Sequence, residues 1–334
     1  MIQTAGIKKL VKQEGDLFRL AIIMLLSLGG MAAINPGNFL TRDVIMTMGF
    51  QIPEFGILAL GMMLAMISGG IDLSVVAIGN LAAIISANIM IYLITPYTSE
   101  TQIVFIMLLA VLTAIITGAV CGAINGLLIS KVGIAPILTT IGTMQIYTGI
   151  SIAATRGSTV IGLPAAFEQI GRGSIWGIPV PFLIFICCVV FITFVFTKTS
   201  YGQKLFMMGS NPTASMFAGL RNNGIIMKTY ILSGVFSAIA CIIFSSRASS
   251  ANASYAVAYV LLAILICVLG GVKPTGGHGR VLGVVMAIFT LQFLSSGFNM
   301  LGFGGFLRQL VWGSVLIFVL LLNHFGNRTK LKTS

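Results

Sequence analysis

Two carboxylic acids, Glu54 and Asp72, stand beside long apolar runs in a sequence of 334 residues with only seven acids. If those runs cross a bilayer, each acid must face protein or water, because a charge at the bilayer centre costs at least about 2.5–3.5 kcal/mol on insertion scales. An acid so placed can bind a proton or a sodium ion, or offer a polar contact along a transport path. Glu54 and Asp72 are therefore the first candidate functional residues.

Asp72 belongs to the stretch Ser68-Gly69-Gly70-Ile71-Asp72-Leu73-Ser74. Two glycines followed by Asp and Ser predict an interruption between two helices, where freed backbone groups line a cavity or meet water. The alternative is that Asp72 or Ser74 is simply the N-cap of the next helix. The two roles are compatible, and the residues alone leave both open.

Glu54 follows Pro53, just before the apolar run 55–67. That run is too short to span a membrane alone at about 1.5 Å per residue. We therefore expect the second span to be kinked or to begin obliquely near Pro53. Glu54 could then serve the outer mouth of a path, or it could be solvated at the membrane interface.

Neutral polar side chains also interrupt the apolar runs. They are Asn80, Asn88, Asn125, Thr139, Thr140, Thr143, Gln145, Gln292 and Asn299. In lipid such groups usually hydrogen-bond across helices, whereas a sugar site would need many of them as donors and acceptors, and the sequence does not choose between the two. Gly118, Gly122 and Gly126 share one helix face and predict close helix packing.

Motifs for catalysis are missing from the sequence. There is no G-x-x-x-x-G-K-[ST] loop for ATP phosphates, no H-E-x-x-H, and no recognisable Ser/His pairing or acid cluster. The five cysteines lie in apolar runs without a C-x-x-C and are best explained as small buried hydrophobes. We therefore expect no catalytic site, metal site or nucleotide site in this chain.

The elements that must position the polar residues are membrane helices. Hydrophobic residues make up 57% of the chain and charged residues only 8%, whereas about 25% is usual for a soluble domain. The apolar runs are long and do not alternate with polar residues, which favours helices over a barrel. Ten spans are predicted, at 18–34, 44–67, 74–95, 103–129, 134–153, 181–197, 228–246, 256–271, 281–299 and 306–323. The predicted fold is an all-α transmembrane bundle forming a single domain, 1–334.

The net charge of +12 is explained by topology. With the N-terminus in the cytoplasm and alternating spans, fourteen of the nineteen basic residues fall on the inside, as the positive-inside rule requires. This places 1–17, 198–227 and the tail 324–334 in the cytoplasm and the loop 154–180 outside. No basic stretch is interleaved with aromatic residues, so a nucleic-acid partner is not expected.

The inner segment 198–227 contains an amphipathic stretch from Pro212 to Leu220. Asn211 is a good N-cap residue, and proline suits the first turn of a helix. We predict a short helix along the cytoplasmic surface. The alternative is a solvated connector.

Taken in order, these motifs resemble the permeases of sugar-type ABC importers, such as those for ribose, arabinose, xylose and autoinducer-2. Gly69 to Ser74 look like the family's GGIDLS signature, and Asn125-Gly126 with the later Pro136, Thr140, Gly142, Thr143 and Met144 are similar to its N-G…P…T-L-G-T-M stretch. Three further segments match: Gly162-Leu163-Pro164 through Pro181 in the outer loop; Thr199, Gly202, Gly209, Asn211, Ala214 and Gly219 in the inner loop; and Gly270-Gly271…Gly276-Gly277-His278-Gly279. The resemblance covers roughly residues 35–320.

The resemblance implies a transport subunit in the bacterial inner membrane that is not itself an enzyme and binds no cofactor. Its implied partners are an ABC ATPase carrying ATP and Mg²⁺, an extracytoplasmic substrate-binding protein, and a second permease, identical or related. Residues implied near the path are Gly69, Gly70, Asp72, Ser74, Asn125 and Thr140, and those implied to couple to the ATPase are Gly209, Asn211, Ala214 and Gly219. Leu262 departs from the family, which often has an acid there, and Ser215 replaces a usual alanine; the first departure leaves the substrate undefined.

Three other functions compete with this one. An ion-driven secondary transporter would use Asp72 or Glu54 as its proton or sodium site. An intramembrane enzyme lacks a catalytic constellation in the sequence. A non-transporting assembly or receptor subunit would keep the helices but not the coupling to an ATPase.

Overall fold

The computed structural model describes residues 2–307 and 309–317, with side chains from residue 17 onward. Within these residues the apolar runs form helices. Eight helices in this part of the chain are long and apolar enough to cross a membrane. They are α1 (Ile2–Ile34), α2 (Arg42–Ile67), α3 (Val75–Leu93), α4 (Glu100–Leu127) with its π-helical extension η1 (Leu128–Val132), α5 (Pro136–Thr155), α7 (Val180–Lys198), α10 (Asn222–Ala248) and α12 (Val281–Met300). The predicted all-α membrane bundle is confirmed.

The other two predicted spans differ from the eight. The run 256–271 yields only α11 (Tyr259–Leu269), whose 11 residues reach about 16 Å, roughly half the hydrocarbon thickness. Residues 308 and 318–323 of the predicted run 306–323, and the whole tail 324–334, lie outside the described residues. The side chains of residues 1–16 are also not described. Eight long helices and one short one therefore account for nine of the ten runs.

Irregular backbone precedes α11, and the bundle satisfies it internally. Residues 253–258 form turns rather than helix. Asn80, buried in α3, donates through Nδ2 to the carbonyl oxygens of Ala253 (3.0 Å) and Tyr255 (2.8 Å). Non-helical backbone within a membrane protein is tolerated where protein supplies its hydrogen bonds, and Asn80 supplies two of them here, a choice between two roles that the sequence left open.

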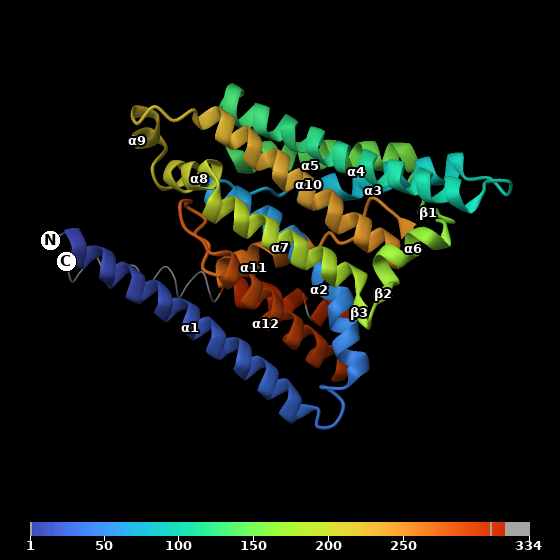
Figure 1. Cartoon of the computed structure of the whole chain (residues 1–334), viewed down its shortest axis with the longest axis horizontal. Coiled ribbons are helices and arrows are strands. Elements are labelled where there is room, and N and C mark those ends of the chain that lie inside the picture. Colours follow the sequence, from blue (N-terminus) through green and yellow to red (C-terminus); the bar gives the residue numbers. More distant parts are fainter. Residues whose placement is uncertain (1, 308, 318–334) are drawn as a thin grey trace.

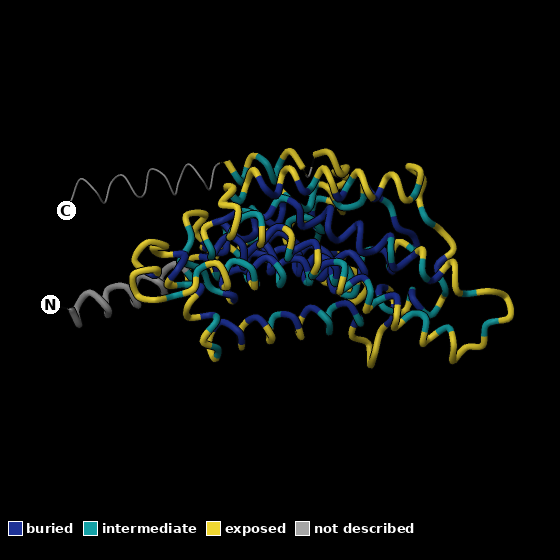
Figure 2. Tube along the Cα trace, turned by 90° about the horizontal axis from the view of Figure 1, so that it is seen from above, coloured by how far each residue is buried: buried dark blue, intermediate teal, exposed yellow. Residues whose placement is uncertain are grey.

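Helix α2 occupies the centre of the bundle, and nearly all of its second half is buried. It packs against α7, α10, α11 and α12, whereas α1 lies along one edge against α12 (Figure 1). The buried residues concentrate along the middle of the molecule, with exposed residues on the outer helices and loops (Figure 2). Because α2 begins at Arg42, Glu54 lies inside this central helix rather than at its start.

Glycines allow the backbones of α4 and α10 to pack closely against each other. A Cβ added at Gly122 would overlap the Tyr230 carbonyl oxygen, and one added at Gly118 would overlap that of Gly234. Only glycine leaves room for two helix backbones at this separation. The predicted packing role of the glycine face of α4 is thus confirmed.

The two long connecting segments lie at opposite ends of α7. Residues 154–180 carry α6 (Ala165–Arg172) and the paired strands β2 (Ser174–Ile175) and β3 (Ile178–Pro179), while β1 (Val160–Ile161) pairs antiparallel with β4 (Ser250–Ala251). Residues 198–227 carry α8 (Ser200–Ser210) and α9 (Pro212–Phe217), then enter α10. We call these two ends of the bundle the α6 end and the α9 end (Figure 1).

The inner segment is more helical than predicted. The expected short helix 212–220 ends at Phe217, because Gly219 takes a left-handed conformation (φ +78°) that terminates it. Helix α8 was not predicted, because its polar and apolar residues do not form a long apolar run. Its N-cap is Thr199, whose hydroxyl oxygen accepts from the Gly202 amide at 3.2 Å.

Candidate translocation and coupling sites

The break between α2 and α3 folds inward around Asp72. Gly69 takes a left-handed conformation (φ +89°), which turns the chain after Ile67. Asp72 Oδ1 accepts from the Ser74 amide (3.1 Å) and the Ser74 hydroxyl (2.6 Å), and its Oδ2 accepts from the Ser233 hydroxyl (2.8 Å). The carboxylate is fully buried, and these donors supply the hydrogen bonds that burial of a charge requires.

The predicted path residues come together in this cluster. Asn125 of α4 donates through Nδ2 to the Ser74 hydroxyl oxygen at 2.8 Å. Thr140 of α5 donates to the Ile71 carbonyl oxygen at 3.1 Å. Four helices, α3, α4, α5 and α10, therefore converge on the break, and we refer to Asp72, Ser74, Asn125, Thr140 and Ser233 as the Asp72 cluster.

Space around the break is tight. A Cβ added at Gly70 would lie 2.5 Å from the Tyr230 hydroxyl oxygen and 2.8 Å from Pro136 Cβ, so glycine is required there. Gly69 is the exposed member of the predicted set, while Asp72, Ser74, Asn125 and Thr140 are buried. Ser74 is the N-cap residue of α3, and it also lies where the four helices converge. The structure is compatible with both roles, so lining of a path by this cluster stays a prediction.

Two buried polar atoms at the cluster have no hydrogen-bond partner among the described protein atoms, namely Oδ1 of its member Asn125 and the hydroxyl of the adjacent Tyr230. Ser233 and Tyr230 both belong to α10 and were missed by sequence reasoning. Serine and tyrosine in an apolar helix are common, and nothing local to 225–240 indicates that they face Asp72. Only the packing of α10 against α4 brings them there.

Glu54 forms a buried ion pair that sequence reasoning did not foresee. Its carboxylate is 1% exposed and meets the Arg247 guanidinium twice, Nε to Oε1 at 2.6 Å and Nη2 to Oε2 at 3.2 Å. The Tyr259 hydroxyl donates to Oε2 at 3.3 Å. Glu54 is therefore buried rather than solvated at an interface, and its contacts join α2 to α10 and α11.

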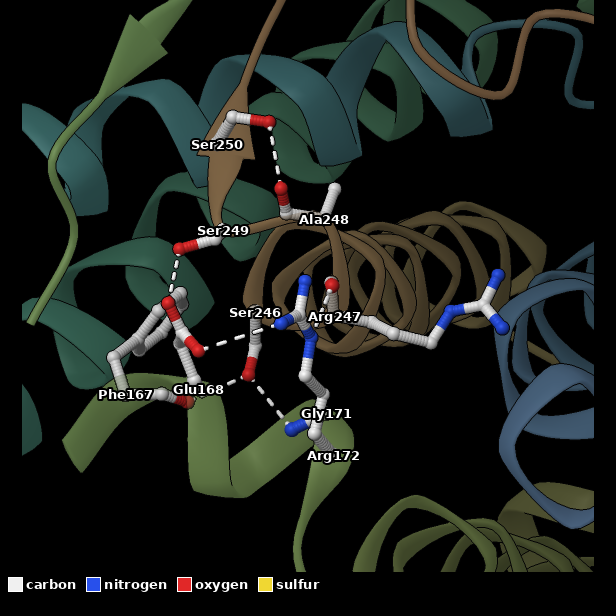
Figure 3. Close-up of polar contacts among 9 residues, drawn as sticks. All are labelled: Phe167, Glu168, Gly171, Arg172, Ser246, Arg247, Ala248, Ser249 and Ser250. Atoms are coloured by element: carbon white, nitrogen blue, oxygen red, sulfur yellow. Dashed lines mark hydrogen bonds and ion pairs between the residues drawn. The ribbon is translucent and has the colours of Figure 1, made fainter. Parts of the chain in front are cut away.

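Helix α6 is attached to the end of α10 next to this pair (Figure 3). The Ser246 hydroxyl donates to the Phe167 carbonyl oxygen (2.6 Å) and accepts from the Gly171 amide (2.7 Å). The Ser249 hydroxyl donates to Glu168, and Arg172 Nε donates to the Arg247 carbonyl oxygen at 2.8 Å. The Arg247 side chain extends away from α6 toward α2.

The predicted coupling residues lie at the opposite end of the bundle. Asn211 caps α9 by accepting from the Ala214 amide at 2.9 Å, as predicted. The Ser215 hydroxyl donates to Asn222 Oδ1 at 2.9 Å, which fastens α9 to the start of α10. Two large apolar side chains of α9 project from the protein, Met216 at 64% and Phe217 at 90% exposure.

A bundle of long apolar helices, with a polar break behind its central helix and a short exposed helix at one end, has the architecture of a membrane transport subunit. No group of three or more His, Cys, Asp or Glu side chains that could hold a metal occurs in the described part of the chain. The geometry supplies no catalytic constellation around Asp72, whose neighbours are hydroxyls and an amide.

Comparisons with known proteins assign the family. The model of the family described as "Branched-chain amino acid transport system / permease component" matches residues 44–322, and the chain belongs to this family. It is 35% identical over 295 residues to the ribose import permease protein of Bacillus subtilis (strain 168), covering 88% of each chain. No solved structure matches the chain.

Two other relatives are similar over comparable lengths. The L-arabinose transport system permease protein of Escherichia coli (strain K12) is 32% identical over 298 residues, 89% of this chain and 88% of that one. The autoinducer 2 import system permease protein of Enterobacter sp. (strain 638) is 31% identical over 311 residues, 90% of both chains.

The chain is thus a multi-pass permease subunit of a bacterial ABC importer, without enzymatic activity of its own. Such a permease works with an ATPase subunit and a substrate-binding protein, as the resemblance in the sequence implied. Family membership selects this function over the ion-driven transporter, the intramembrane enzyme and the assembly subunit.

Proposed function

We propose that this permease imports a sugar or a sugar-like small molecule across the cytoplasmic membrane. The observation that carries the proposal is its similarity, over about nine tenths of its length, to permeases named for ribose, L-arabinose, D-allose and autoinducer 2. The small charge content of the chain suits a neutral, polyhydroxylated solute, because neutral polar side chains can carry such a solute without a buried countercharge.

We further propose that α9 is the helix that seats in the ATPase, which binds ATP and Mg²⁺. Met216 and Phe217 support this role, because exposed large apolar side chains on a short helix suit insertion into a partner's groove. Asn211 and Ala214 hold the helix start, and Gly219 releases the chain after it. ATP binding and hydrolysis would then shift the permease between inward-open and outward-open states.

The proposed path passes the Asp72 cluster with Gly69 and Gly70. These residues lie at the α9 end, where movement of the ATPase would reach them first. Hydroxyl and amide groups that now bond one another can exchange these partners for solute hydroxyls when the helices separate.

The proposed orientation has the α9 end and both termini in the cytoplasm, supported by the excess of basic residues in the predicted inner segments. The binding protein would dock on the opposite side, on residues 154–180. A second permease, identical or related, completes the path in this proposal.

The test is reconstitution of the permease with its ATPase and binding protein in liposomes, followed by uptake of labelled ribose, L-arabinose and D-allose. We expect uptake of at least one of these sugars that requires ATP and survives an uncoupler. Uptake driven by an ion gradient without ATP would refute the ABC mechanism, and ATP-driven uptake of amino acids but no sugar would refute the substrate class.

The ATPase interface is tested separately with Phe217→Arg. We expect the ATPase to dissociate from this variant during purification, because a charge replaces the exposed apolar anchor. The matched control is Phe306→Arg, an equally exposed phenylalanine remote in sequence from α9. Normal copurification with Phe217→Arg would remove α9 from the interface.

A further inference from the structure

Four glycines bring three segments into backbone contact at the α9 end of the bundle. They are Gly69 after α2, Gly209 at the end of α8, and Gly276 and Gly277 in the turn before α12, and we call them the glycine joint. A Cβ added at Gly209 would overlap the Ile67 carbonyl oxygen, and one added at Gly276 would lie 2.7 Å from the Gly209 carbonyl oxygen. The contact is therefore possible only without side chains.

Hydrogen bonds hold the same three segments. The Gly277 amide donates to the carbonyl oxygen of Ile67, the last residue of α2, at 2.9 Å. The terminal carbonyl groups of a helix lack partners within the helix, so this bond supplies α2 with a cap from a segment about 210 residues away. The Ser210 hydroxyl donates to the Phe206 carbonyl oxygen at 2.8 Å and makes a second, longer contact with the Gly277 carbonyl oxygen at 3.4 Å.

The joint lies between the coupling helix and the Asp72 cluster. Ser210 directly precedes Asn211, the N-cap of α9, so α9 begins three residues after Gly209. On the other side, Gly69 is three residues from Asp72, whose Oδ2 accepts from Ser233 of α10. A continuous series of backbone contacts and hydrogen bonds thus connects α9 to α2 and to the proposed path.

Backbone-to-backbone contact makes this connection stiff. A side chain can change rotamer to absorb a displacement, but two backbones in van der Waals contact cannot, because close-packed interiors have low compressibility. Met216 and Phe217 can adjust to the ATPase, whereas Gly209 cannot move without moving Ile67 and Gly277.

We propose that the glycine joint transmits ATPase movement from α9 to α2 and the Asp72 cluster, with α8, the end of α2 and the turn at Gly276 moving as one body. This rests on the proposed seating of α9 in the ATPase. Gly276 and Gly277 are then positioning residues for coupling, in addition to Gly209.

The first test compares Gly276→Ala with Gly271→Ala in the reconstituted importer. Both glycines lie before α12 and are left-handed (φ +89° and +82°), so alanine brings similar backbone strain to both, about 1–2 kcal/mol. Gly271 has no atom within 4 Å of an added Cβ, whereas Gly276 would meet Gly209 and Gly69. Only Gly276→Ala therefore forces the joint apart.

The measurement is solute taken up per ATP hydrolysed. We expect Gly276→Ala to lower this ratio about tenfold, a magnitude typical of coupling between sites, while ATP hydrolysis continues. Gly271→Ala should keep the wild-type ratio. Equal ratios in the two variants would overturn the proposal, because a merely strained turn would affect both alike.

A second measurement leaves the glycines intact and decides the question if Gly276→Ala does not assemble. Spin labels are placed at the exposed positions Met207 and Thr275, with the exposed Cys187 replaced by serine. We expect the interlabel distance to be unchanged between nucleotide-free and ATP-trapped importers. A changed distance would show that the segments move separately and would overturn the joint.

The three proposals, on the substrate, the seating of α9 and the glycine joint, fail differently. If wild-type importer takes up no sugar, the substrate proposal fails, and the label distance still decides whether the joint is rigid. If Phe217→Arg keeps its ATPase, the seating of α9 fails. If sugars are imported and α9 seats as proposed but the coupling ratios are equal, the glycine joint alone is refuted.

Discussion

Removal of Arg247 should lower the free energy of unfolding by more than the intact ion pair contributes, because Glu54 would stay buried without its countercharge. The Glu54 carboxylate is 1% exposed, whereas Arg247 is 32% exposed and reaches the surface at the α6 end. Replacement of Arg247 with Met keeps an unbranched apolar side chain but removes the guanidinium, so that among the described residues the buried carboxylate keeps only the Tyr259 hydroxyl, at 3.3 Å.

The size of the effect follows from the distances. At 2.6 Å between Nε and Oε1, the attraction is about 6 kcal/mol with an effective dielectric constant near 20. Desolvation of two ions costs several kcal/mol each, so the pair as a whole is close to neutral for stability. Removal of one partner keeps the cost for Glu54 without the attraction, and we expect Arg247→Met to destabilise by about 3–5 kcal/mol.

The assay is the free energy of unfolding of the purified permease, from denaturant titration in detergent. The double variant Glu54→Met/Arg247→Met should recover most of the loss, because neither charge remains buried. Arg172→Met is the comparison: it loses a more exposed ion pair with Glu168 at 3.5 Å and one hydrogen bond to the Arg247 carbonyl oxygen, which together should cost about 1–2 kcal/mol.

Two results would refute this reasoning. If the double variant were as unstable as Arg247→Met, the loss would come from packing rather than from an unpaired charge. If Arg247→Met and Arg172→Met lost the same stability, the burial of Glu54 would carry no penalty, and the pair would not fasten α2 to α10.

Three further predictions concern the interior. Asp72→Leu leaves the buried donors of Ser74 and Ser233 without an acceptor, at a cost of about 1–3 kcal/mol each, whereas Asp72→Asn keeps one acceptor oxygen. The yield of folded protein from membranes should therefore be highest for the unmodified chain, lower for Asp72→Asn and lowest for Asp72→Leu. Equal yields would contradict the network. Asn80→Leu leaves two carbonyl groups unpaired and should lower the unfolding free energy by about 1–3 kcal/mol in the same titration; no loss would mean that they find other donors. Gly122→Ala should lower the melting temperature by separating α4 from α10, whereas Gly142→Ala, with open space around it, should not; similar melting would refute the packing role.

The overall class of this protein followed from features that need no tertiary information. Lipid demands runs of about 20 apolar residues and internal satisfaction of every backbone group, so run length and composition predict a helical bundle. Asn211 before Pro212 predicted a helix start, because capping depends on neighbours in sequence. Gly69 to Ser74 predicted a break for the same local reason.

Contacts between distant segments could not be predicted in this way. Arg247 lies 193 residues from Glu54, and neither has a local pattern that indicates the other. The same holds for Ser233 and Asp72, which are 161 residues apart, and for Gly209 and Gly277. Helix α11 is shorter than its apolar run, because the preceding residues follow irregular backbone that Asn80 satisfies.

Sequence alone therefore determined that the chain is a membrane-embedded helical permease with a broken segment at Asp72 and a short helix after Asn211. Only the tertiary structure decided that Glu54 is neutralised by Arg247, that Asp72 is held by α4 and α10 through Asn125, Ser74 and Ser233, and that glycines join α8 to α2. The physical reason is that these helices are apolar on nearly every face. Their arrangement depends on a few small residues and polar pairs, whose partners become neighbours only after packing.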